Sequence, residues 1–218
     1  MKKIAVILSG CGYLDGSEVT EATSLFIEFS RNDISYDVYA PNQSARPTPH
    51  FDGGLLEPAP RNCMEESARI TRGNIRDLNE LNPSRYDGLA LPGGYGVAKN
   101  LSTWAMDGHK CSVNRKFKDV VLNFFSNSKP ILAICISPAI VAKILSDETE
   151  PTLTIGNDPE TIAEIEKTGA EHVKCSVTDF VSDRESKIIS TPAYMYNAKP
   201  HEVFEGIQKA SAEFLEMC

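Results

Sequence analysis

The stretch Ile131-Leu132-Ala133-Ile134-Cys135-Ile136-Ser137-Pro138-Ala139 decides the fold of this chain. Its aliphatic run, 131–134, is typical of a short strand buried on both faces of a parallel sheet. A helix over 137–145 follows almost at once, and Pro138 suits its first turn, where no intrahelical N–H bond is lost. A buried strand that leads directly into a helix is the repeating unit of α/β proteins.

The same alternation recurs along the whole chain. The hydrophobic pattern predicts strands over 4–8, 35–40, 86–91, 131–134, 152–155 and 172–175, and a hairpin from 180–182 and 187–190. It predicts helices over 17–30, 61–72, 114–126, 137–145, 158–168 and 200–216. No linker-like stretch or repeat interrupts this order, so we expect one domain over 1–218, with a mainly parallel sheet and helices on both faces.

Composition and charge narrow the classes of partner. The 218 residues are 41% hydrophobic and 24% charged, which is typical of a globular protein. The net charge of −8 argues against nucleic acids and anionic membranes as main partners. The apolar run 4–8 is too short for the core of a secretory signal, and no stretch is long enough to span a membrane. We therefore expect a cytoplasmic protein.

Six cysteines are dispersed along the chain, and none forms a CxxC pair. A secreted disulfide framework is normally shorter and denser, and the spacings of zinc sites are missing. We expect free thiols and no bound metal.

Ligands of parallel sheets bind beyond the carboxyl ends of the strands, which here means the loops after Leu8, Leu91 and Ile134. In the third loop, Cys135 stands where a strand turns sharply into a helix. The helix amino terminus favours an anion, so we expect a nucleophilic thiolate. The alternative is a small buried residue that only fills the crossing of strand and helix.

The second loop is Pro92-Gly93-Gly94-Tyr95-Gly96. Its glycines let the backbone pass close to a ligand, and their N–H groups are suited to stabilise an oxyanion. The alternative is an ordinary glycine-rich turn. The spacing matches neither a dinucleotide fingerprint nor a P-loop, so we expect no nucleotide cofactor.

The first loop supplies Cys11, Tyr13, Asp15 and Glu18. A partly buried Glu18 beside a thiol would have a raised pKa and could shuttle a proton. The alternative role for Glu18 is to complement the amino terminus of the first helix. We expect Tyr13, Gly93, Tyr95 and Asn100 to contact the substrate.

Together these loops resemble the ThiJ/PfpI superfamily, which is related to class I glutamine amidotransferases. The closer resemblance is to its enhancing-lycopene-biosynthesis (ElbB), glyoxalase-like branch, and it covers nearly the whole chain. The matching segments are Ile7-Leu8-Ser9-Gly10-Cys11-Gly12, Asp15-Gly16-Ser17-Glu18, Leu91-Pro92-Gly93-Gly94-Tyr95-Gly96, Ala98-Lys99-Asn100-Leu101-Ser102, Ile134-Cys135-Ile136-Ser137-Pro138-Ala139, Thr152-Leu153-Thr154-Ile155-Gly156, Gly169-Ala170-Glu171-His172-Val173 and Thr191-Pro192-Ala193-Tyr194-Met195.

The resemblance implies a flavodoxin-like three-layer sandwich, with Cys135 as the nucleophile and Glu18 beside its sulfur. It implies that N–H groups near Gly94 and Ile136 bind the oxyanion. The branch is described as a glyoxalase that converts glyoxal to glycolate without glutathione, metal or another cofactor, and it has been discussed as a protein deglycase. Relatives commonly form homodimers, so we expect one here.

One departure concerns histidine. Amidotransferase and protease members place a histidine soon after the nucleophile, but His50, His109, His172 and His201 all lie elsewhere. This leaves Glu18 as the expected proton carrier and counts against a Cys-His-acid triad.

Three questions stay open from the sequence. The protein could instead be a non-catalytic redox sensor, with Cys11 as a resolving partner of Cys135, or an amidotransferase-like subunit that needs a partner. The segment 42–60, which includes His50-Phe51-Asp52-Gly53-Gly54, could cover the site or pack on its rim.

Overall fold

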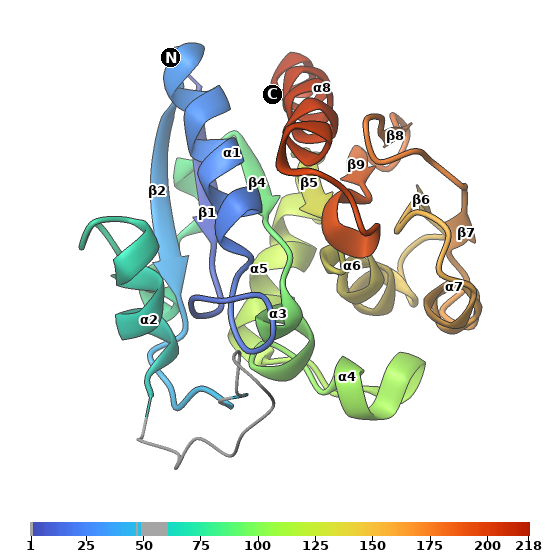
Figure 1. Cartoon of the computed structure of the whole chain (residues 1–218), viewed down its shortest axis with the longest axis horizontal. Helices are drawn as coiled ribbons and strands as arrows, with labels where there is room; N and C mark the ends of the chain where they lie inside the picture. Colours follow the sequence, from blue (N-terminus) through green and yellow to red (C-terminus); the bar gives the residue numbers. More distant parts are fainter. Residues whose placement is uncertain (1, 47, 49–60) are drawn as a thin grey trace.

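The computed structural model describes residues 2–46, 48 and 61–218 (Figure 1). Within these residues a seven-stranded sheet forms the centre of the molecule. In spatial order its strands are β3 (Arg76–Asp77), β2 (Ser35–Ala40), β1 (Lys3–Ile7), β4 (Gly88–Leu91), β5 (Ile131–Ile134), β9 (Ile188–Thr191) and β8 (Val181–Asp183). All neighbours are parallel except β8 and β9, which form the predicted antiparallel hairpin.

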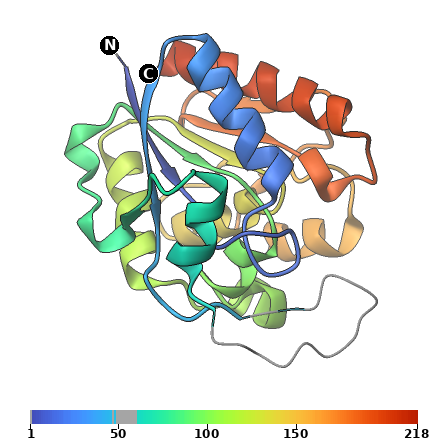
Figure 2. The same cartoon turned by 60° about the vertical axis from the view of Figure 1, so that its left-hand side comes forward.

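Helices cover both faces of this sheet (Figures 1 and 2). One face carries α1 (Val19–Arg31) and α8 (Pro200–Met217), which pack together through the rings of Phe29 and Phe214. The opposite face carries α5 (Arg115–Ser126) and α6 (Ser137–Leu145). The expected flavodoxin-like sandwich with a mainly parallel sheet is therefore confirmed.

The helix α5 illustrates why the sequence folds this way. Its buried residues are Phe117, Val120, Val121 and Phe124, which recur at the three- and four-residue spacing of one helical face. Asn114 begins the helix by accepting a hydrogen bond from the backbone N–H of Phe117 at 3.1 Å. Burial of this apolar face against the sheet provides the main favourable free energy for the helix.

The remaining elements are short. They are α2 (Cys63–Ile70), α3 (Tyr95–Lys99), α4 (Trp104–Asp107), α7 (Pro159–Glu166), and a separate pair of parallel strands, β6 (Thr152–Leu153) and β7 (Glu171–His172). Short 3-10 turns cover Leu78–Glu80, Pro83–Arg85, Gly108–Lys110 and Ala193–Met195. The sequence did not predict β3, α3 or α4, and β6 and β7 lie outside the main sheet. The strands β3, β6 and β7 and the helices α3 and α4 are each too short to give a clear hydrophobic period.

The order of the central strands decides where a ligand can bind. Because β1, β4 and β5 are adjacent and parallel, their carboxyl ends meet at one edge of the sheet. The loops after Leu8, Leu91 and Ile134 therefore converge, as predicted. In Figure 1 this is the lower edge of the sheet, where α3 lies.

Two further expectations concern cysteines and membranes. All six cysteines are free thiols, as expected. Over the described part of the chain, no helix has the length and apolar character needed to cross a bilayer.

Candidate functional site

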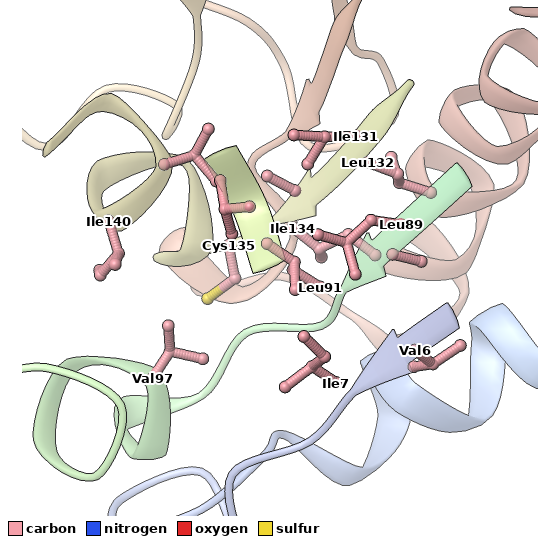
Figure 3. Packing of buried hydrophobic residues seen from close by; sticks show 14 of the residues in the cluster. Val6, Ile7, Leu89, Leu91, Val97, Ile131, Leu132, Ile134, Cys135 and Ile140 are labelled. Atoms are coloured by element: carbon pink, nitrogen blue, oxygen red, sulfur yellow. The ribbon is translucent and has the colours of Figure 1, made fainter. Parts of the chain in front are cut away.

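Cys135 occupies a tight turn between β5 and α6. Its φ angle is +62°, a left-handed conformation that costs a non-glycine residue roughly 1–2 kcal/mol. Its N–H donates to the carbonyl of Thr191 at 2.9 Å, and the Ser137 hydroxyl donates to the carbonyl of Pro92 at 2.9 Å, so both neighbouring loops hold the turn. Figure 3 shows Cys135 directly beyond Ile134, with its sulfur turned toward the helix that carries Val97.

The glycine loop approaches Cys135 too closely for any side chain. A Cβ at Gly93 would lie 2.4 Å from the Cβ of Cys135 and 2.8 Å from Oε2 of Glu21. Gly94 has a φ of +91°, and a Cβ there would lie 2.3 Å from the carbonyl oxygen of Gly16. The sequence therefore needs glycine at both positions, for close approach at Gly93 and for backbone conformation at Gly94.

The carboxyl group that contacts the Cys135 thiol is that of Glu21. Their side chains share a hydrogen bond, and Glu21 is completely buried. Its Oε2 accepts from the N–H of Gly93 at 2.9 Å, and its Oε1 accepts from the N–H of Tyr194 at 3.3 Å. Two loops, those of Gly93 and Tyr194, thus hold the Glu21 carboxyl group against the Cys135 sulfur.

Burial controls the protonation of this pair. Burial and the nearby charge of Glu18 raise the pKa of Glu21 to about 8. Burial, followed by the charge of Glu21, raises the pKa of the Cys135 thiol well above its ordinary value. The expectation that the helix amino terminus favours a thiolate is therefore wrong for the resting pair, because desolvation outweighs it. At neutral pH the Glu21 carboxyl group and the Cys135 thiol are therefore both mainly protonated.

Two backbone groups oppose this effect. The N–H groups of Gly94 and Ile136 donate to the sulfur of Cys135 and lower its pKa, although by less than burial raises it. These are the two groups that the family resemblance implies as an oxyanion site. The structure places them at the reactive sulfur, and their binding of an oxyanion stays a prediction.

Glu18 lies one helical turn before Glu21 and has a different setting. Its carboxylate caps α1 by accepting from the N–H of Glu21 at 2.7 Å, so the capping alternative is correct. It also lines the same cleft as Cys135, and burial raises its pKa. Glu18 is thus positioned at the cleft, whereas Glu21 makes the contact with the thiol that the resemblance implied for Glu18.

A cleft of about 570 Å³ opens above Cys135. Its volume is suited to a small organic molecule. Its described lining consists of Tyr13, Glu18, Gly94, Tyr95, Ala98, Trp104, Ala105, Gly108, Cys135, Ile136, Asp158, Glu160, Thr161, Glu164, Tyr194 and Met195.

The four residues expected to contact the substrate divide into two pairs. Tyr13 and Tyr95 line the cleft and are 53% and 48% exposed. Gly93 and Asn100 do not line it. Gly93 lies behind the pair of Cys135 and Glu21, where its N–H binds the carboxyl group.

Asn100 holds loops together. Its amide donates to the carbonyls of Ser9 and Asp15 at 2.9 and 2.7 Å, and its Oδ1 accepts from the N–H of Arg46 at 2.9 Å. All its side-chain polar atoms are used inside the protein. The structure therefore gives Asn100 a positioning role, away from the cleft around Cys135.

No histidine lines this cleft among the described residues. Nε2 of His172 accepts from the N–H of Ile155 at 3.2 Å, and Nδ1 of His109 lies 2.6 Å from Glu164. His201 lies in the first turn of α8, and His50 lies outside the described residues, as does most of the segment 42–60. Within the described ranges, no three His, Cys, Asp or Glu side chains are grouped so that they could hold a metal ion.

Sequence reasoning missed Glu21 and the contribution of Tyr194. A signal for Glu21 was present, because Glu18 and Glu21 have the three-residue spacing that places both on one helical face. Nothing in the sequence near Tyr194 indicated that its N–H reaches back to the first helix. That contact depends on the order of strands in the sheet.

Comparison with known proteins identifies the family. The chain is 34% identical over 225 residues to the mitochondrial ES1 protein homologue of Rattus norvegicus, covering 99% of this chain and 84% of the relative. It is 35% identical to glutamine amidotransferase-like class 1 domain-containing protein 3, mitochondrial, of Homo sapiens, covering 99% and 83%. The chain belongs to the family of these ES1 and glutamine amidotransferase-like class 1 domain-containing proteins. No family model matches the chain.

Solved structures agree with this membership. A crystal structure of an isoprenoid biosynthesis protein with an amidotransferase-like domain from Ehrlichia chaffeensis is 36% identical, covers 100% of this chain and 99% of that one, and has a TM-score of 0.93. Glyoxalase III from Candida albicans has a TM-score of 0.64 and 14% identity, covering 99% of this chain and 97% of that one, which shows a shared fold alone.

The expected location is contradicted by these relatives. The ES1 relatives from rat, human and zebrafish (Danio rerio) are all named as mitochondrial proteins. The prediction of a cytoplasmic protein rested on the lack of a recognisable targeting segment, which does not exclude another compartment.

Proposed function

We propose that this protein is a cofactor-independent glyoxalase, which converts glyoxal or methylglyoxal to a 2-hydroxy acid through a hemithioacetal on Cys135. The observation that supports it best is the hydrogen bond between the thiol and the buried carboxyl group of Glu21, at the floor of a cleft that a small dicarbonyl can enter. The fold shared with glyoxalase III is compatible with this proposal.

The proposed reaction begins when the pair of Cys135 and Glu21 loses one proton. The sulfur attacks an aldehyde carbon, and the N–H groups of Gly94 and Ile136 stabilise the alkoxide that forms. The proton that remains with Glu21 then neutralises this alkoxide. One C–S bond is made and the C=O double bond becomes a single bond, which gives the hemithioacetal.

Glu18 acts next, from its place in the cleft. Its carboxylate removes the proton from the hemithioacetal carbon, and an enediolate forms. The hydroxyl proton of the first carbon passes to the oxygen of the second, and Glu18 returns its proton to the second carbon. A thioester is left at the first carbon and an alcohol at the second. One carbon is oxidised and the other reduced, so no external oxidant is needed. Water then cleaves the thioester, releasing the 2-hydroxy acid and the thiol.

The first test is turnover of glyoxal by purified protein without glutathione or added metal, followed as glycolate formation. We expect Cys135→Ala to abolish turnover, and Cys11→Ala, which changes a thiol outside the cleft lining, to retain it. Wild-type turnover by Cys135→Ala would refute the proposed nucleophile.

The role of Glu18 needs a separate readout. We expect Glu18→Gln to lower kcat about 100-fold, which is typical of losing a general base. Its Cys135 thiol should still react with a neutral alkylating reagent at least as fast as in wild type, because the charge of Glu18 raises the pKa of Glu21. Equal losses in turnover and in alkylation would indicate a damaged site instead.

A redox-sensor function is less well supported, because burial raises the pKa of Cys135 and readily oxidised sensor thiols have a low pKa. We also propose a homodimer, on the basis of the family. Light scattering coupled to size-exclusion chromatography tests it, and a monomer over the working concentration range would contradict it.

A further inference from the structure

The ionisable side chains around the cleft share one sign of charge. Besides Cys135, the ionisable lining residues among those described are Tyr13, Glu18, Tyr95, Asp158, Glu160, Glu164 and Tyr194, and none is lysine, arginine or histidine. A cleft lined by one sign of charge concentrates ligands of the opposite sign and repels ligands of the same sign. The charge of the substrate is therefore a property that this cleft can select.

The negative charges of the four acidic side chains, Glu18, Asp158, Glu160 and Glu164, are not equally offset by neighbouring groups. Glu164 lies 2.5 Å from Nζ of Lys167 and 2.6 Å from Nδ1 of His109, so neighbouring groups offset its charge. Glu160 is exposed in the first turn of α7, and its side chain has no hydrogen bond or ion pair within the described part of the chain. Asp158 caps the same helix through the N–H of Thr161.

Glu18 faces the cleft from a different element. It begins α1, whereas Asp158 and Glu160 begin α7, so carboxyl groups contribute from two elements. One cation, Lys99, lies close to the aromatic lining, with its Nζ 5.2 Å from the centre of the Tyr95 ring. That ammonium group already donates to the carbonyl of Leu14 and the hydroxyl of Thr48, and it does not line the cleft.

Aromatic rings provide an independent observation. Tyr13, Tyr95, Trp104 and Tyr194 line the same cleft. The faces of such rings attract cations through their quadrupole, and an ammonium group placed between a ring and a carboxylate benefits from both. Rings and acids together favour a positively charged ligand group, and no described lining side chain carries a positive charge that could pair with a carboxylate or a phosphate.

We infer that this cleft selects carbonyl substrates that are neutral or positively charged and excludes those that carry a carboxylate or phosphate. As a statement about substrates it rests on the proposed function. The residue assigned to this selection is Glu160, which acts on the charge of the ligand and takes no part in the chemical steps.

The test measures the charge preference of Cys135 without requiring turnover. Three methanethiosulfonates are compared, bearing a trimethylammonioethyl, a methyl or a sulfonatoethyl group. In each, the Cys135 sulfur bonds to the sulfenyl sulfur, methanesulfinate leaves, and the thiol proton passes to solvent. Peptide mass mapping gives the rate at Cys135 alone, and division by the rate of free cysteine removes the intrinsic reactivity of each reagent.

We expect the normalised rate to be at least about 10-fold higher for the cationic than for the anionic reagent, as for unit charges a few ångströms apart near a protein surface. Glu160→Gln should reduce this ratio about 3- to 10-fold, and Glu160→Lys should reduce it further. Glu166→Gln is the matched control, because Glu166 lies on the same helix but does not line the cleft. A wild-type ratio equal to that of free cysteine, or an equal effect of Glu166→Gln, would overturn the inference.

A second measurement separates this inference from the proposed function. The kcat/KM for methylglyoxal is compared with that for a 2-oxoaldehyde bearing a carboxylate, and we expect the anionic compound to be at least about 10-fold poorer. Equal kcat/KM values would overturn the inference while leaving the glyoxalase proposal intact. Charge-selective labelling without any turnover would overturn the glyoxalase proposal and support charge selection by the cleft.

Discussion

Replacement of Glu21 by glutamine tests the central feature of this site, the buried carboxyl group beside the thiol. Glutamine has nearly the same shape but does not titrate. It can accept only one of the two backbone hydrogen bonds from Gly93 and Tyr194, because one carboxyl oxygen becomes an NH₂ group. We expect that loss to destabilise the variant by about 1–2 kcal/mol at every pH.

Glu21→Gln also changes how the free energy of unfolding depends on pH, and this second effect favours the variant. The pKa of Glu21 is raised to about 8 from an ordinary 4.5. The folded state therefore binds one more proton than the unfolded state between these values, and the free energy of unfolding falls as the pH rises through this window. The fall is about 1.4 kcal/mol per pH unit, so wild type loses roughly 3 kcal/mol between about pH 5.5 and about pH 8.5 through this one group. Glu21→Gln lacks this loss.

Urea denaturation at several pH values in that range measures the difference. We expect the stability of the variant relative to wild type to rise by roughly 3 kcal/mol from about pH 5.5 to about pH 8.5, so that the two are of similar stability near pH 5.5 and the variant is the more stable near pH 8.5. Glu28→Gln, another buried glutamate of α1, is the matched control for loss of a carboxylate from this helix. A difference between wild type and Glu21→Gln that stays constant with pH, after subtraction of the control, would refute the raised pKa.

Three further predictions concern the same site. The kcat/KM for glyoxal should rise with pH, reach half its maximum near pH 8 and level off above it, as the pair of Cys135 and Glu21 loses its first proton; a profile that is flat from about pH 6 to about pH 9 would contradict this. Gly93→Ala should lower both stability, by about 2–4 kcal/mol, and turnover, because its Cβ would clash with Cys135. Gly73→Ala meets no atom within 4 Å and should cost only about 1 kcal/mol of backbone strain, so equal effects in urea denaturation would count against the clash. Asn100→Ala should lower stability by about 2–4 kcal/mol while leaving KM within about 2-fold of wild type, and a large rise in KM at unchanged stability would instead favour substrate binding.

Local sequence was sufficient for the elements that carry strong hydrophobic patterns. The predicted strands 35–40 and 131–134 and the helix 137–145 have the observed bounds. The predicted strand 152–155 is shorter in the structure, at Thr152–Leu153. It pairs only with β7, because a short segment of two or three residues is placed by its partners and not by its own pattern.

Some features of the site around Cys135 also follow from local sequence, and others do not. A strand that leads straight into a helix determined the left-handed turn at Cys135, and a run of glycines determined that backbone would lie against it. These are local properties, set by steric limits on a few neighbouring residues.

Only the tertiary structure decided which acid meets the thiol and in which state of protonation. Glu18 caps α1 and Glu21 lies in its first turn. Their spacing alone does not say which of the two is enclosed by the loops that follow β4 and β5 and by the loop of Tyr194. The enclosed residue is Glu21, and its enclosure removes water from both carboxyl group and sulfur. Desolvation depends on everything packed around a group, so the sequence determined the reactive residue types and the assembled fold determined their pKa values.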